Sequence, residues 1–169
     1  EYPNPAFERM RIDDALWAAQ IVSRFSAEAI RQVVRTGRLG NPEAEGYLAD
    51  TLVARRDKIV DRYFRALNPL HAFRVEEGAV TFENLGERVG LARAESYEYQ
   101  WFAVDNASGT LTPLGEPTPS PDARVSLPAS AATYTMVRIR TRSGAAPAWR
   151  HSVDVFLRNG SAPVVVGVE

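Results

Sequence analysis

Apolar residues recur at helical spacing through the first 68 residues of the chain and in simple alternation after them. In the first part, apolar positions three and four residues apart fall in three stretches. This spacing places apolar side chains on one face of a helix. It predicts helices over residues 14–24, 26–37 and 42–67.

The expected helix ends carry residues that suit them. Asp13, Ser26 and Asn41 are polar residues of the kind that accept a hydrogen bond from the first turn of a helix. Pro42, directly after Asn41, suits the first helical position. We expect Gly37 to end the second helix in a left-handed conformation.

The predicted helices have more apolar surface than three helices can cover. In the second helix, Ile30, Val33 and Val34 are expected to face inward. The apolar face of the third helix consists of Tyr47, Leu48, Leu52, Ile59, Val60, Tyr63, Phe64 and Leu67. We therefore expect the rest of the chain to cover this face, so that the protein unfolds as one cooperative unit.

The second part of the chain shows strand signals about every ten residues. The predicted strands cover residues 73–76, 80–84, 97–104, 110–114, 124–127, 134–141, 153–158 and 163–168. Turn-forming residues at 105–109 and 159–161 separate neighbouring strands. No helical pattern lies between the strands, which favours antiparallel pairing over a parallel sheet.

These patterns predict an α+β fold. An N-terminal three-helix segment, residues 1–68, is expected to pack on a C-terminal antiparallel β-sandwich, residues 69–169. The sandwich would be Ig-like or jelly-roll-like, with about seven or eight strands. The junction is Asn68-Pro69, and His71 beside it is expected to form a hydrogen bond between the two subdomains.

Composition excludes several kinds of site. The 169 residues have a net charge of −1, which argues against binding to nucleic acid. The mean hydropathy is −0.25, and no apolar run is long enough for a membrane span. Cysteine is absent and there are two histidines, so disulfides and thiolate chemistry are excluded and we expect no metal and no cofactor.

Two arrangements could support a hydrolase. His151 could act as a base oriented by Asp154, although residues three apart on a strand point to opposite faces. Asp50, Asp57 and Asp61 share one face of the third predicted helix and could work as a carboxylate pair. A salt-bridged surface explains the same acidic row, because basic residues are interleaved with it.

Three aromatic residues alternate along one predicted strand. Tyr97, Tyr99 and Trp101 share a face, and two of the three residues on the opposite face are polar. This alternation favours an inward Trp101 and a structural role for the rings. If the rings point outward instead, they form a flat platform of the kind that binds sugars.

Arginines alternate along another predicted strand. Arg138, Arg140 and Arg142 occupy one face of it, and apolar residues occupy the other. Such a row could contact an anionic ligand or an acidic partner, or form an ordinary charged surface.

Several segments resemble the C-terminal part of a family of large bacterial proteins of uncharacterised activity. They are DDALWAAQIV at 13–22, FS at 25–26, EAEGYLA at 43–49, RRDKI at 55–59, NPL at 68–70, YQWFAVDN at 99–106 and VGVE at 166–169. The resemblance implies a piece of a longer, exported protein located in the periplasm or at the cell surface. It supplies no catalytic residues.

The leading hypothesis is therefore a non-catalytic accessory or binding module of a larger bacterial protein. Its partner would be another protein or the remainder of a longer chain, with no nucleic acid and no membrane span. The alternative is a carbohydrate-binding module that uses the aromatic strand to hold a glycan. The third hypothesis is a hydrolase with a carboxylate or histidine site.

Overall fold

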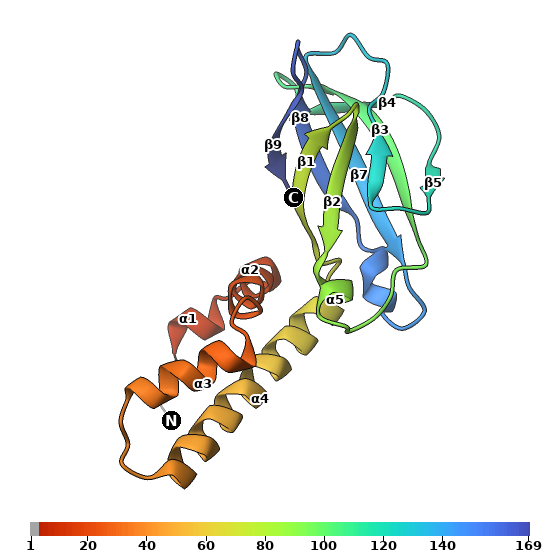
Figure 1. Cartoon of the computed structure of the whole chain (residues 1–169). Coiled ribbons are helices and arrows are strands. Elements are labelled where there is room, and N and C mark those ends of the chain that lie inside the picture. The colour runs from red at the N-terminus through yellow and green to blue at the C-terminus, as the bar shows by residue number, and fades with distance from the viewer. Residues whose placement is uncertain (1–3) are drawn as a thin grey trace. The chain divides into compact units, whose positions relative to one another are not determined.

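The computed structural model describes residues 4–169, except for the side chains of Ala6 and Phe7. The chain divides into two compact units, Glu1–Phe64 and Arg65–Glu169, which we call the helical unit and the β unit. Helices dominate the first, and two antiparallel sheets form the second (Figure 1). The predicted α+β class, with helices followed by a sandwich-like arrangement of strands, is confirmed.

The three predicted helices are present. The helices of this part of the chain are α1 (Pro5–Glu8), α2 (Ile12–Val22), α3 (Ala27–Thr36) and α4 (Pro42–Ala66). Short α1 was not predicted. Within the helical unit, α3 and α4 form an antiparallel pair (Figure 1).

Two of the predicted helix starts are confirmed by their hydrogen bonds. The Ser26 hydroxyl accepts from the Ala29 backbone N–H at 3.0 Å and begins α3. The Asn41 side-chain oxygen accepts from the Glu43 N–H at 2.9 Å and begins α4. Both satisfy N–H groups that the helix itself leaves without a partner.

One predicted helix start was wrong, and Gly37 ends α3 as predicted but not in the predicted left-handed conformation. Asp13 lies in the first turn of α2, and Arg11 is the N-cap, with its backbone N–H donating to Asp14 Oδ2 at 3.1 Å. Gly37 has φ −69°, in the right-handed region, and the left-handed residue is its neighbour Arg38, with φ 46°. A local sequence pattern locates a helix end to within one or two residues only.

The β unit contains two sheets. Its strands are β1 (Leu70–Glu76), β2 (Ala79–Asn84), β3 (Ser96–Asp105), β4 (Thr110–Pro113), β5 (Thr118–Ser120), β6 (Arg124–Ser126), β7 (Tyr134–Arg142), β8 (Val153–Arg158) and β9 (Val164–Val168). The smaller sheet has the order β1-β2-β6. The larger has the order β4-β3-β7-β8-β9, and β5 also pairs with β3. All eight predicted strands correspond to strands here, and β5, in the proline-rich connection, was missed.

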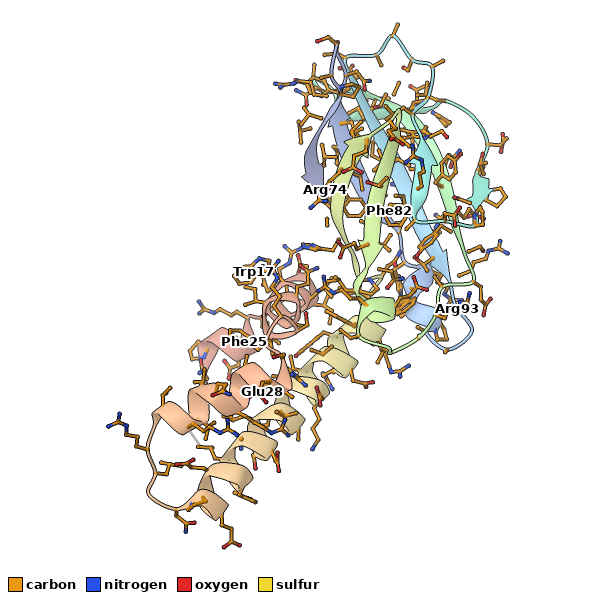
Figure 2. All side chains as sticks on the ribbon, viewed as in Figure 1. Trp17, Phe25, Glu28, Arg74, Phe82 and Arg93 are labelled. Carbon is orange, nitrogen blue, oxygen red and sulfur yellow. The ribbon has the colours of Figure 1, made fainter. Side chains whose placement is uncertain are left out.

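The core of the β unit lies between the two sheets. It is built from Leu70, Val80, Phe82, Tyr97, Trp101, Val125, Val137, Ile139, Val155 and Leu157. The ring of Phe82 meets that of Tyr97 edge-on, with centroids 5.1 Å apart, and joins the smaller sheet to the larger (Figure 2). Alternation along each strand therefore directs the apolar residues into one shared layer.

Two short helical turns close one end of the β unit. They are α5 (Leu85–Arg88) and the 3₁₀ turn η1 (Pro147–Arg150), and neither was predicted. Trp149 of η1 is fully buried against Gly86 of α5. Beside them, the amide of buried Asn68 donates to the His151 carbonyl at 3.1 Å and accepts from the Thr141 hydroxyl at 2.8 Å. The Asn68-Pro69 junction is thus held by hydrogen bonds to β7 and to the residue after η1.

Candidate functional site

The aromatic residues of β3 belong mainly to the core. Tyr97 is 3% exposed and Trp101 is 6% exposed, whereas Tyr99 is half-buried. The Trp101 indole N–H donates to the Ser126 carbonyl at 3.0 Å, which satisfies the one polar group of the buried ring. The predicted inward orientation of Trp101 is confirmed, and the three rings do not form an exposed platform.

The hydroxyl of Tyr97 is also held inside the β unit. It donates to Glu87 Oε2 at 3.2 Å, while the other carboxylate oxygen of Glu87 accepts from the Ala94 backbone N–H at 2.8 Å. Burial, together with the nearby charge of Glu87, raises the pKa of Tyr97 well above its usual value. The phenol therefore stays protonated and acts as a structural hydrogen-bond donor.

A small pocket remains at the edge of β3. Its volume is about 220 Å³, and Tyr99 and Trp101 line part of it, together with exposed residues of the connection that contains Glu116. Tyr99 and Trp101 each contribute part of their side chain to the pocket wall. It is the part of the aromatic strand that a small ligand could contact.

The arginines of β7 are paired with carboxylates. Arg138 holds Asp154 through two hydrogen bonds, of 2.8 and 2.6 Å, and its guanidinium lies 5.4 Å from the centre of the Phe102 ring. The hydrogen bond to Asp154 raises the pKa of Arg138.

The other two arginines share one acidic partner. Arg140 and Arg142 lie 3.4 and 3.5 Å from the carboxylate of Glu98 on β3. The predicted row of arginines is present on the outer face of the larger sheet. Carboxylates on β3 and β8 compensate much of its charge, which reduces its attraction for an anion.

The histidines considered as functional residues do not form the predicted catalytic pair. His151 is exposed, and the carboxylate of its proposed partner Asp154 is taken up by Arg138. His71 is half-buried in β1, and its hydrogen bond between the subdomains stays a prediction.

Two residues of the acidic row of α4 form surface ion pairs. Asp50 lies 3.0 Å from Arg31, and Asp57 lies 2.7 Å from Arg56. Within residues 4–169, no three histidine or carboxylate side chains come together in a way that could hold a metal ion. In the same residues, no helix is long and apolar enough to cross a membrane.

An apolar groove lies in the helical unit. It lies between the end of α2, α3 and α4 and has a volume of about 400 Å³. Its lining consists of Val22, Phe25, Ile30, Val33, Leu52, Arg55, Arg56 and Ile59. Phe25 stands where α2 leads into α3 (Figure 2). Six of these eight side chains are apolar, and the other two are arginines.

Packing within the helical unit fixes the shape of this groove. Val34 and Ala49 are buried and hold α3 against α4. Arg56 donates to the Phe25 carbonyl at 2.6 Å and to Asp57 Oδ1 at 2.7 Å, so it ties the α2–α3 connection to α4. These contacts connect the walls of the groove to one another.

The sequence pattern only partly revealed the groove. Of the α3 residues expected to face inward, Val34 is buried but Val33 is 65% exposed. Leu52 and Ile59 of α4 are also exposed. The sequence feature that indicated an open apolar surface was the apolar face of the third predicted helix, which is too wide for three helices to cover. Which of its residues remain open depends on how α3 lies on α4, and periodicity alone does not specify that.

Comparison with protein-family models, with curated proteins and with solved structures found no match for this chain.

Proposed function

We propose that this chain is a non-catalytic binding module of a larger bacterial protein, and that it docks a protein segment in the apolar groove of its helical unit. The partner is another protein or the remainder of a longer chain. The observation that carries the proposal is the groove itself, whose apolar lining is open to solvent at Val33, Leu52 and Ile59.

Hydrophobic burial supplies the driving force for docking. Complete burial of a valine, leucine, isoleucine or phenylalanine side chain stabilises a complex by about 1.5–3 kcal/mol. The groove offers several such side chains at one place, in walls held by Val34, Ala49 and Arg56. Arg56 ties the α2–α3 connection to α4, which reduces the free energy that a partner loses to reorganisation of the groove.

Two further parts of the proposal rest on the family resemblance of the sequence. They are that the module belongs to a longer exported protein, and that it works in the periplasm or at the cell surface. The carbohydrate-binding alternative has less support, because the rings of Tyr97 and Trp101 are buried. For the hydrolase alternative, Asp154 is already engaged by Arg138.

The proposal is tested with a designed amphipathic helical peptide that has a leucine ridge and uncharged glutamine flanks. In an NMR titration, we expect saturable shifts of amide resonances at the groove. The variants Val33→Glu and Leu52→Glu should each weaken binding about tenfold or more, because a charge would then face the leucine ridge.

The matched control is Val164→Glu on β9, which places the same charge at an exposed valine of the β unit. It should leave peptide binding unchanged, and circular dichroism should confirm that all variants are folded. Unsaturable shifts, or equal affinity for the Val33→Glu variant and the original chain, would contradict the proposal.

A further inference from the structure

Charges are segregated around the long helix α4. Arg55, Lys58 and Arg62 are three and four residues apart, so at about 3.6 residues per turn they form one row. Arg55 itself lines the groove, and the row borders the apolar wall made by Leu52 and Ile59. The acidic residues Asp50, Asp57 and Asp61 form a second row opposite Leu52 and Ile59, and Asp61 in this row is a surface neighbour of Lys58.

The acidic and basic sides of α4 differ in their partners. Asp50 is paired with Arg31 and Asp57 with Arg56. In residues 4–169, Arg55, Lys58 and Arg62 have no ion pair, and the guanidinium of Arg62 lies only near the Tyr63 ring, 5.8 Å from its centre. The border of the groove on α4 thus carries three positive charges that are not engaged in ion pairs.

The opposite wall of the groove is uncharged along its border. Val33 of α3 is flanked at the preceding and following turns by Ala29 and Thr36. The electrostatic character of the groove is therefore one-sided, with a basic border on α4 and a neutral border on α3.

We infer that the occupant of the groove is a partner helix whose apolar ridge is flanked on one side by acidic residues. This inference rests on the proposed function and specifies its partner. An amphipathic helix places an apolar ridge and a charged row side by side, as this groove requires. Charge complementarity with Arg55, Lys58 and Arg62 sets its orientation and favours acidic over basic partners.

Two other occupants fit the groove less well. A second copy of the chain, docked symmetrically groove to groove, would set two basic rows beside each other, and like charges disfavour that pairing. An anionic membrane would also attract the basic row. However, membrane-surface helices present a convex apolar face, whereas these apolar residues line a hollow of about 400 Å³.

The test uses three designed helical peptides with the same leucine ridge, whose single flanking row is glutamate, glutamine or lysine. Binding to the full chain is measured by fluorescence anisotropy at about 0.02 M and about 0.3 M salt. We expect the glutamate peptide to bind about tenfold more tightly than the lysine peptide at low salt. The difference should shrink at high salt, because these charges are exposed.

A charge reversal identifies the residues responsible. Arg55→Glu should remove the preference for the glutamate peptide over the lysine peptide, whatever its effect on binding of the glutamine peptide. Arg35→Glu is the matched control, since Arg35 lines a separate small pocket on the other side of α3, and it should keep the preference. An equal loss of preference in both variants would overturn the assignment to this row.

The remaining outcomes separate this inference from the proposed function. If the glutamine peptide binds the groove but the glutamate and lysine peptides bind equally, the inference is overturned and the proposed function stands. If no peptide binds, both are overturned. Two further results would overturn the inference: dimerisation of the chain that Val33→Glu abolishes, or binding to phosphatidylglycerol vesicles that Arg55→Glu abolishes.

Discussion

At the scale of single residues, two buried polar side chains of the β unit, Asn68 and Trp101, find their partners far away in the sequence. Asn68 bonds to Thr141 and to the His151 carbonyl, and the Trp101 indole bonds to the Ser126 carbonyl. A buried polar group without a partner is costly, so these bonds determine which neighbours each residue accepts. They explain why the Trp101 ring can be buried whole.

Removal of the Trp101 side chain should therefore destabilise the β unit strongly. We expect Trp101→Ala to lower the free energy of unfolding by about 3–5 kcal/mol, through lost burial and the cavity left behind. The measurement is urea denaturation followed by circular dichroism. As a control, Val164→Ala at an exposed position should change stability by no more than about 0.5 kcal/mol. If Trp101→Ala behaves like this control, the ring is not part of the core.

At the scale of elements, the short helical turns α5 and η1 pack closely together. This packing is possible because a glycine, which has no side chain, lies at the contact. Gly86 of α5 faces the indole of Trp149 in η1, and a Cβ atom added at residue 86 would overlap that ring. The contact joins α5, which precedes β3 in the sequence, to η1, which follows β7. The tight fit requires glycine for its small size, because the backbone of Gly86 is not in the left-handed region.

Two glycine substitutions should therefore have opposite effects. Gly86→Ala should destabilise the β unit by about 1–3 kcal/mol or more, because the Trp149 ring must move out of a packed site. Gly46 lies in α4 with open space around it, so Gly46→Ala should stabilise the helical unit by about 0.5–1 kcal/mol. Thermal unfolding of both variants checks the signs. A stable Gly86→Ala protein would contradict the close contact.

At the scale of the whole molecule, each compact unit has a different kind of surface. The helical unit exposes apolar residues around a groove, whereas ion pairs such as Arg138–Asp154 cover the larger sheet of the β unit. On α4, Asp50 is paired with Arg31 and Asp57 with Arg56. Stability should therefore come from packing and internal pairing in both units.

It follows that divalent metal ions should not change the stability of the chain. We expect the melting temperature to be the same with EDTA, with added zinc and with added calcium. An ion that binds only to the native state of the chain must raise its melting temperature. A rise of several degrees with either ion would contradict this prediction and indicate a site among the carboxylates.

The sequence by itself determined the features that depend on neighbouring residues. Alternation predicted eight of the nine strands found in residues 4–169, and Ser26 and Asn41 marked the starts of α3 and α4. These signals are local, because side-chain direction repeats every two residues in a strand and about every 3.6 in a helix. The inward direction of Trp101 followed from the same alternation.

Only the tertiary structure decided which surfaces stay open and which charges meet. β5 exists because three residues of a proline-rich connection pair with β3, and Glu98 compensates Arg140 and Arg142 because β3 and β7 are neighbours. Val33 is exposed because α3 packs on α4 through Val34 instead. Each outcome depends on contacts between segments distant in the sequence, and a pattern of period two or 3.6 carries no information about which segments meet.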